Sequence, residues 1–390
     1  MNNLWDENEA KKYKTDPLAM RVYTSRLLGS DQNLVLHGGG NTSVKIGEYL
    51  YVKGSGWDLA TIEKEGFPAV NLSVLKKMVT LPHLSDTDMV SGQKEAMKDK
   101  TYPNPSVEAI LHAIIPFSTV DHTHADAVVT ISNTILGKEL LQNIYGKNML
   151  IIDYVMPGFI LAQKIYEQTK GIDWGTLDGI ILLNHGIFTF DNHPKKSYDK
   201  MIKYVNMAED YLAKHTLFEV PKTNLCALSD DEIKHFSSLV STLRGCDVQG
   251  KLIDTTEACY FATLPNVNSL IHRGPLTPEH VIRTKAFPFV VDAYFDGELE
   301  EFTKNYETYF DAYSTNEIML DLAPRYAIIK NRGVVVFGKD DKENTILTDI
   351  VSHTIHAMLQ AEKLGGWFSL DKHDIFDMEY WELEQAKLKK

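Results

Sequence analysis

Helical and extended patterns of apolar residues alternate along this chain. Residues 16–30 and 195–216 place apolar positions with the period of an amphipathic helix. The segment PNPSVEAILHAI predicts another helix near Ser106, because a serine N-cap precedes apolar residues at helical spacing. LDGIILLNHGIFTF (177–190) predicts strand, turn and strand. The chain is therefore expected to combine helices with β-strands.

Two further segments are expected to be extended. Residues 33–56, NLVLHGGGNTSVKIGEYLYVKGSG, consist of short β-like segments separated by glycine turns. VDHTHADAVVTI, residues 120–131, ends in a run of β-branched residues, so it is predicted to be a strand or a loop followed by a strand. The polar residues of VDHTH would then come just before the apolar run AVVTI.

A segment in the second half of the chain is similar in sequence to a segment in the first half. IKNRGVVVF (329–337) resembles LLNHGIFTF (182–190), and each is followed by a charged turn and a predicted helix. The alignment matches Gly186 with Gly333, but it places Arg332 opposite His185. Strand–turn–strand–helix arrangements are common, so the pattern leaves open whether the second half is a degenerate copy of the first.

The length of 390 residues predicts two domains. The polar segment PKTNLCALSDDE, around residues 221–232, is the best candidate for a boundary. We therefore expect one domain over residues 1–225 and a second α/β domain over residues 226–390, the latter being the possible copy.

Composition restricts the partners and the location. A formal net charge of −13 argues against nucleic acid or an anionic membrane as the main partner. The polar N-terminus has no apolar signal segment, and the longest apolar stretch, residues 149–162, is too short to span a membrane. Three cysteines without CxxC spacing favour a reducing compartment over a disulfide framework or a thiolate zinc site. These features predict a cytoplasmic protein.

Three histidines are candidates for a metal site. His122 and His124 are two residues apart, so in a strand their imidazoles would project from the same face. His185 lies at a predicted junction between strand and turn and supplies a third nitrogen ligand. Three imidazoles with an open fourth position are typical of catalytic zinc or another divalent ion. Each histidine taken alone is more often structural, so the prediction depends on the three coming together.

Three loops offer hydrogen-bond donors for a phosphate. LHGGGNTSVK (36–45) and KGSGWDL (53–59) combine glycine turns with hydroxyl side chains, and Ser106 lies at a helix start where backbone amides and the dipole favour an anion. The alternative for each glycine loop is an ordinary tight turn. Glu108, two residues further on, is either a complement to the helix dipole or a general acid/base. Spacing alone does not choose between these roles.

Taken in order, these motifs resemble the class II aldolase/adducin family. The resemblance rests on GGGNTSVK, KGSGWDL, PSVEAILH, DHTHADAV and LLNHGIFTFDN, and it covers roughly residues 20–215. Two later stretches, residues 272–285 and 376–388, are similar to the aldolase portion of bifunctional rhamnulose-1-phosphate aldolase/lactaldehyde dehydrogenase proteins. The resemblance implies a three-layer α/β/α fold around a mainly antiparallel sheet.

The resemblance also implies a role for each motif. The metal, Zn²⁺ or another divalent ion, would be bound by three histidines, and Glu108 would be the catalytic acid/base. The substrate phosphate would be bound by Asn41, Thr42, Ser55, Gly56 and Ser106. Two departures from the family pattern are a shorter interval from Glu108 to the HxH motif and Ala125 in place of a proline. The first bears on how Glu108 reaches the substrate.

The implied function is metal-dependent retro-aldol cleavage of a deoxyketose 1-phosphate of the rhamnulose-1-phosphate type. The products would be dihydroxyacetone phosphate and lactaldehyde, which would make the protein a carbon–carbon lyase of rhamnose catabolism. A homo-oligomer and a separate aldehyde dehydrogenase are the expected partners, with no nucleic acid and no membrane. The alternatives are a sugar-phosphate epimerase or dehydratase of the same superfamily, and a non-catalytic adducin-like interaction module.

Overall fold

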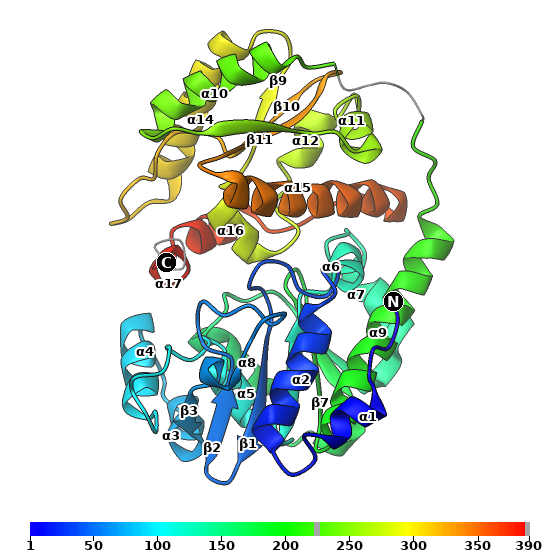
Figure 1. The fold of residues 1–390 in the computed structure, drawn as a ribbon, viewed down its shortest axis with the longest axis vertical. Helices are drawn as coiled ribbons and strands as arrows, with labels where there is room; N and C mark the ends of the chain where they lie inside the picture. Colours follow the sequence, from blue (N-terminus) through cyan, green and yellow to red (C-terminus); the bar gives the residue numbers. More distant parts are fainter. Residues whose placement is uncertain (222–226, 387–390) are drawn as a thin grey trace. The chain divides into compact units, whose positions relative to one another are not determined.

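The computed structural model describes residues 1–221 and 227–386, which form two compact units (Figure 1). The first unit comprises residues 1–132 and 136–214. The second comprises residues 133–135 and the described residues from His215 on. The domain boundary predicted between residues 225 and 226 lies outside the described residues, as does Cys226.

A seven-stranded sheet forms the centre of the first unit, in the order β3-β2-β1-β4-β7-β6-β5. Neighbouring strands are antiparallel, except for the parallel pair β5 and β6. The strands are β1 (Asn41–Ile46), β2 (Tyr49–Val52), β3 (Ala69–Asn71), β4 (Thr119–Thr123), β5 (Met149–Ile152), β6 (Gly179–Leu182) and β7 (Gly186–Asp191). The helices are α1 (Glu7–Lys11), α2 (Pro17–Gly29), α3 (Leu72–Met78), α4 (Asp86–Glu95), α5 (Ala109–Ile114), α6 (Asp126–Ser132), α7 (Gly137–Tyr145), α8 (Phe159–Gln168) and α9 (Pro194–His215).

Helices cover both faces of this sheet, as two neighbouring residues of β1 show. The Ser43 hydroxyl lies 2.8 Å from Nδ1 of His112 in α5. The hydroxyl of Thr42 lies 2.8 Å from that of Ser25 in α2. Because successive side chains of a strand point to opposite faces, α5 and α2 lie on opposite sides of the sheet.

The long helix α9 lies on the same side of the sheet as α2. Ser197 of α9 donates a hydrogen bond of 2.5 Å to Asp121 of β4, and Arg21 of α2 forms a buried ion pair of 2.6 Å with the same carboxylate. The first unit is therefore a three-layer α/β/α structure around a mainly antiparallel sheet. This confirms the fold class implied by the resemblance.

One predicted strand is wrong. The strand β4 ends at Thr123, and the β-branched run that follows it belongs to the helix α6. Residues 127–132 are all buried, so the alternation of apolar and polar positions that distinguishes a strand from a helix is missing there. Packing on every side has overridden the β propensity of valine, threonine and isoleucine.

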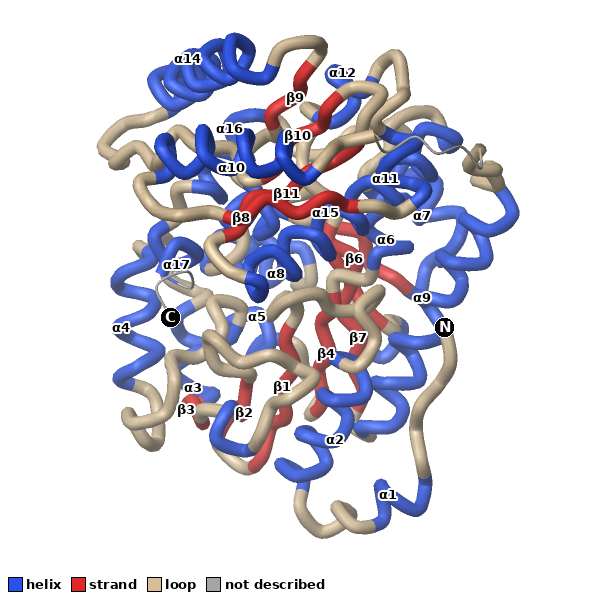
Figure 2. Tube along the Cα trace, turned by 45° about the horizontal axis from the view of Figure 1, so that its top comes forward, coloured by secondary structure: helices blue, strands red, loops and turns tan. Residues whose placement is uncertain are grey.

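A four-stranded sheet forms the centre of the second unit, in the order β8-β11-β10-β9 (Figure 2). Its strands are β8 (Gln249–Ile253), β9 (Phe289–Val291), β10 (Tyr326–Ile329) and β11 (Gly333–Gly338). Its helices are α10 (Asp230–Arg244), α11 (Thr256–Phe261), α12 (Val267–Ile271), α13 (Val281–Thr284), α14 (Phe295–Tyr313), α15 (Asp341–Ala361), α16 (Lys372–Glu379) and α17 (Glu382–Gln385). Within this unit, α15 lies on the opposite side of the sheet from α10 and α14 (Figure 1).

An aromatic core joins this sheet to α10 and α14. Phe236 of α10 stacks on Phe295 of α14 with ring centroids 3.9 Å apart, and Phe289 of β9 contacts Phe295 edge to face. Val335 and Phe337 of β11 belong to the same buried cluster. The second unit is thus an α/β domain with a hydrophobic core of its own, as the sequence predicted.

Two observations bear on the expected location. Within the described ranges, no helix combines the length and the apolar character that crossing a membrane requires. Cys246 is exposed and free, whereas Cys259 is disulfide-bonded, which differs from the reduced cysteines expected from the sequence.

Candidate functional site

The structure brings the three predicted histidine ligands together in the first unit. His122 is the fourth residue of β4, His124 follows the end of that strand, and His185 precedes β7. One ring nitrogen from each histidine lies within 4.8 Å of those of the other two. The Nε2 atoms of His122 and His124 are 3.0 Å apart. His185 is 61 or more positions away from the other two histidines in the sequence. It lies beside them because β4 and β7 are direct neighbours in the sheet.

Backbone and aromatic contacts fix the orientation of His122. Its Nδ1 lies 3.1 Å from the carbonyl oxygen of Ile187, and because a carbonyl only accepts, Nδ1 is the donor. In the neutral imidazole, Nε2 is then left with a lone pair that points toward His124. The ring stacks on Phe188 with centroids 3.9 Å apart and an interplanar angle of 11°. His122 is fully buried.

A glycine allows the two histidine-bearing segments to approach each other. A Cβ on Gly186 would lie 3.0 Å from Cε1 of His122 and 3.0 Å from Cδ2 of His124, and it would overlap the carbonyl oxygen of Thr123. The preceding turn places Asn184 at a φ of 59°, in the left-handed region that asparagine tolerates better than most residues. The sequence NHG therefore combines a turn, a candidate metal ligand and a glycine that leaves room for His122 and His124.

This donor set fits a divalent metal ion. Zinc–nitrogen bonds of about 2.0–2.1 Å in tetrahedral geometry hold nitrogen ligands about 3.3 Å apart. The 3.0 Å between the Nε2 atoms of His122 and His124 is close to that separation. Carboxylate oxygens of Glu108 lie 3.5 Å from Nε2 of His122 and 3.9 Å from Nε2 of His185.

Glu108 faces the histidines and does not cap its helix. It is the residue before α5, and its side chain makes no capping hydrogen bond in the described structure. Instead its Oε2 accepts a hydrogen bond of 2.6 Å from Nδ2 of Asn41, while its Oε1 has no hydrogen-bond partner among the described residues. Only 4% of Glu108 is exposed. A buried carboxylate with one free oxygen beside the imidazoles of His122 and His185 is equipped for proton transfer.

Two of the predicted phosphate-binding loops lie side by side. Gly54 and Pro105 form an isolated β-bridge, and the backbone N–H of Ser106 donates to the carbonyl of Lys53 at 3.0 Å. Gly56 has a φ of 87° and is exposed. The described structure therefore places Ser55, Gly56 and Ser106 in one local region near Glu108.

Thr42 lies apart from this group. Its side chain is fully buried on the α2 side of the sheet, where it contacts Ser25. Asn41, its neighbour in β1, faces α5 and Glu108. The strand alternation that brings Asn41 to the site turns Thr42 away from it.

Sequence reasoning missed two polar residues of this region. Lys53 is buried, and its Nζ donates a hydrogen bond of 3.0 Å to the carbonyl of Gly38 in the GGG loop. The sequence feature that could have indicated this residue is its position as the first residue of the motif KGSG. His112 is fully buried between Asn41 and Ser43. Its position four residues after Glu108, on the same helical face, was the available signal.

Burial lowers the pKa of His112 well below its ordinary value of 6.5. The neighbouring His122, Lys45 and Arg21 act in the same direction, because each disfavours a second positive charge. His112 is therefore a neutral imidazole at physiological pH.

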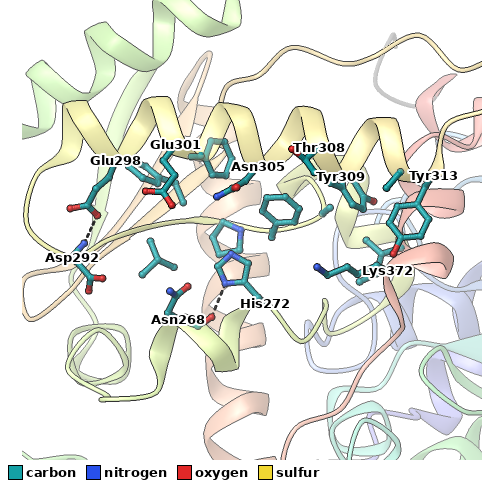
Figure 3. A pocket seen from close by; sticks show the side chains of 18 residues that line it. Asn268, His272, Asp292, Glu298, Glu301, Asn305, Thr308, Tyr309, Tyr313 and Lys372 are labelled. Carbon is teal, nitrogen blue, oxygen red and sulfur yellow. Dashed lines mark hydrogen bonds between the residues drawn. The ribbon is translucent and has the colours of Figure 1, made fainter.

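The second unit contains a cavity of about 630 Å³ that includes none of the predicted site residues (Figure 3). His272 and Lys372 line it together with residues of α14. One of its acidic members, Glu298, is engaged within the protein, since it accepts from the backbone N–H groups of Asp292, Ala293 and Tyr294. The cavity has the size of a ligand pocket but no cluster of catalytic groups comparable to the histidine site.

Comparison with known sequences defines the class of protein: the chain belongs to the class II aldolase/adducin family. Residues 20–212 match the profile of the class II aldolase and adducin N-terminal domain. Residues 230–388 match the profile described as the second domain of class II aldolase. The two profiles correspond to the two α/β units of the structure.

Two relatives illustrate the range of similarity. The chain is 38% identical to the N-terminal class II aldolase domain of a conserved protein from Thermoplasma acidophilum, with a TM-score of 0.50 over 54% of this chain and 99% of that one. It is 28% identical over 420 residues to the uncharacterized oxidoreductase YuxG of Bacillus subtilis, a match that covers 100% of this chain. The chain spans 60% of the length of that relative.

Proposed function

We propose that this protein is a metal-dependent aldolase that cleaves a deoxyketose 1-phosphate of the rhamnulose-1-phosphate type into dihydroxyacetone phosphate and lactaldehyde. The observation that carries the proposal is the convergence of His122, His124 and His185 opposite the buried carboxylate of Glu108. The similarity of residues 272–285 and 376–388 to aldolases of that type favours this substrate over other sugar phosphates.

The three histidines would hold Zn²⁺ or another divalent ion. When bound, such an ion supplies Lewis-acid stabilisation of the negative charge that develops on substrate oxygen atoms when the C3–C4 bond breaks. The hydrogen bond from His122 to Ile187 and the stacking on Phe188 would hold one of these ligands, His122, in place. Burial of His122 and His185 keeps bulk water away from the reacting atoms.

Glu108 would move the proton that the reaction requires. As the C3–C4 bond breaks, the C4 hydroxyl loses its proton and becomes the aldehyde carbonyl, and C3 of the enediolate needs a proton to become dihydroxyacetone phosphate. This role is supported by the carboxyl group itself, which has one oxygen bonded to Asn41 and the other without a hydrogen-bond partner among the described residues. This assigns Glu108 the role of catalytic acid/base.

The phosphate would bind where the two loops lie side by side. Ser55, Gly56 and Ser106 offer hydroxyl and backbone donors, and the buried ammonium group of Lys53 adds positive charge. We leave Thr42 out of this set because its hydroxyl is bonded to Ser25 on the other face of the sheet. Binding the phosphate away from the bond that breaks would position the sugar for cleavage.

A coupled assay for dihydroxyacetone phosphate across a panel of deoxyketose 1-phosphates, with and without chelator, tests the proposal. We expect product from L-rhamnulose 1-phosphate and loss of activity in chelator that added metal restores. An epimerised or dehydrated sugar without dihydroxyacetone phosphate would contradict cleavage and favour the epimerase or dehydratase alternative. Lack of stoichiometric metal together with inactivity would favour an interaction module.

The aldehyde product implies a partner. We propose that a separate aldehyde dehydrogenase in the same cytoplasm oxidises lactaldehyde, a proposal that the name of the longer Bacillus subtilis relative, an oxidoreductase, supports. We also propose that the protein works as a homo-oligomer, which light scattering at several protein concentrations would test.

A further inference from the structure

A single chain of hydrogen bonds leads from the sheet to the carboxylate of Glu108. Ser43 Oγ lies 2.8 Å from Nδ1 of His112, and Nε2 of His112 lies 2.5 Å from Oδ1 of Asn41. Nδ2 of Asn41 lies 2.6 Å from Oε2 of Glu108. All four residues are at most 6% exposed. Bulk water is therefore a poor substitute for any member of the chain.

The chemistry of the groups fixes the direction of every bond. The carboxylate of Glu108 only accepts, so Asn41 donates through Nδ2 and presents its oxygen to His112. Nε2 of His112 must then carry the proton, and Nδ1 accepts from the hydroxyl of Ser43. Each donor points toward Glu108, so successive bonds polarise one another in the same sense.

We propose that His112 is a positioning residue that acts through Asn41 to hold the Glu108 carboxylate with Oε2 fixed and Oε1 directed at the reacting substrate. The proposal rests on the proposed function, because it assigns a task to Glu108. It also changes the role of Asn41: one amide hydrogen and the amide oxygen serve Glu108 and His112, which leaves the second hydrogen of Nδ2 for a phosphate.

No other contact of the Glu108 side chain with the described residues fixes it in this way. The residue precedes α5 without capping it, so the helix does not hold the carboxylate in the described structure. Its other neighbours are the imidazoles of His122 and His185, at 3.5 Å and 3.9 Å. Loss of the chain would let the carboxylate rotate toward these imidazoles and away from the substrate.

Kinetics of variants test the positioning role. His112→Leu should lower kcat about 10-fold or more, as expected when a catalytic group is misplaced, while KM stays within about two-fold and metal content is unchanged. His112→Gln should recover part of the loss, because its amide again offers a donor to Asn41. Unchanged kcat in His112→Leu, or equal losses in the two variants, would overturn the proposal.

A matched pair of serines separates positioning from general stability. Ser43→Ala removes the first donor of the chain, whereas Ser25→Ala removes a buried hydroxyl on the opposite face of the same sheet. We expect kcat to fall about three-fold in Ser43→Ala and to stay unchanged in Ser25→Ala, with similar losses of thermal stability. Equal kcat in the two variants would contradict a chain that acts on Glu108.

A measurement without substrate distinguishes this inference from the proposed function. In the metal-free protein labelled with ¹⁵N-histidine, long-range proton–nitrogen spectra report the tautomer of each imidazole, and the His112 signals are assigned by their loss in His112→Gln. We expect the Nε2–H tautomer. The Nδ1–H tautomer would overturn the hydrogen-bond chain whatever the activity is, whereas inactivity on every sugar phosphate with the Nε2–H tautomer present would overturn the function alone.

Discussion

Four strands of the first unit and the four strands of the second are arranged alike. In the first unit β7 lies between β4 and β6, and in the second β11 lies between β8 and β10. Both central strands are antiparallel to both of their neighbours. In each sheet the strand at the end of this set, β5 or β9, runs parallel to its neighbour. A long helix, α9 or α15, follows the central strand in each case.

The turns before the two central strands also agree in detail. Asn184 and Asn331 have φ angles of 59° and 61°. The backbone N–H of His185 donates to the carbonyl of Leu182, and that of Arg332 donates to the carbonyl of Ile329. A second backbone hydrogen bond is also shared. The N–H of Leu183, just after β6, donates to the carbonyl of Ile152 at the end of β5, and the N–H of Lys330, just after β10, donates to the carbonyl of Val291 at the end of β9. We propose that the second sheet is a degenerate copy of this part of the first.

The difference between the sheets lies in the residues at equivalent positions. Register with the central strand places Leu252 of β8 where His122 stands in β4. Arg332 takes the position of His185, and its guanidinium has no lone pair for a metal. It forms an ion pair with Glu232, with bonds of 2.7 Å and 2.9 Å. This strand arrangement therefore does not depend on the candidate metal ligands, which are single side chains at or near the ends of its strands.

The largest effect is expected from converting the first sheet toward the second. His122→Leu reproduces the residue of the other sheet and removes the central ligand. We expect metal content to fall from about one ion per chain to near zero and turnover to fall about 10³-fold, since the Lewis acid supplies several kcal/mol of stabilisation. Elemental analysis and the coupled assay measure both. The reverse change, Leu252→His, should gain no metal, and retained metal in His122→Leu would contradict the ligand assignment.

Glu108→Gln tests the acid/base role without removing a ligand. The amide fills the same space but transfers no proton, so turnover should fall roughly 10²-fold while metal content stays at the wild-type level. Near-normal turnover would show that Glu108 serves only to complement the dipole of α5.

Gly186→Ala tests how closely the ligand-bearing segments must approach each other. The added Cβ would lie 3.0 Å from ring atoms of both His122 and His124. We expect metal affinity to fall about 10-fold and stability to fall by roughly 1–3 kcal/mol, the usual result of overpacking. Metal titration and thermal unfolding provide the two values. Wild-type affinity would mean that the segments separate without moving the ligands.

Arg332→Ala should have the smallest effect and a defined pH dependence. The hydrogen bond from Arg332, followed by those from Ser229, lowers the pKa of Glu232 from 4.5 to about 2. Because the folded-state pKa is depressed, the stabilisation is present above pH 4.5 and is lost as pH falls toward 2. Both side chains are more than a third exposed, so we expect a loss of about 0.5 kcal/mol at pH 7.

The difference between wild type and Arg332→Ala should shrink below pH 4 in chemical unfolding experiments. A difference that grows on acidification would contradict the ion pair as its cause. Activity should not change, because Arg332 belongs to the second unit and takes no part in the histidine site.

Local patterns in the sequence predicted the elements with clear periodicity. The amphipathic pattern of residues 195–216 is α9, Pro194–His215, because one face of that helix packs on the sheet. The run AVVTI failed as a strand, because residues buried on every side carry no period to read. The HxH motif with a third histidine in NHG was readable because ligand chemistry restricts the residue types.

The hydrogen-bond chain that ends at Glu108 could not be predicted from the sequence in the same way. Asn41 and Glu108 are 67 positions apart, and Asn41 and His112 are 71 apart. Only the pairing of β1 with β4 and the packing of α5 on that face bring them together. Serine, histidine and asparagine in such positions are common in any core, so spacing alone gives no signal for a chain of this kind.

The metal content of the purified full chain tests the central claim most directly. After reconstitution with Zn²⁺ and removal of excess ion, native mass spectrometry of the wild type should find one ion per chain, and His122→Leu should bind none. That result would place the chemistry in the first sheet and leave the second without metal. A wild-type chain that binds no ion, or an ion that stays in place in His122→Leu, would contradict the account.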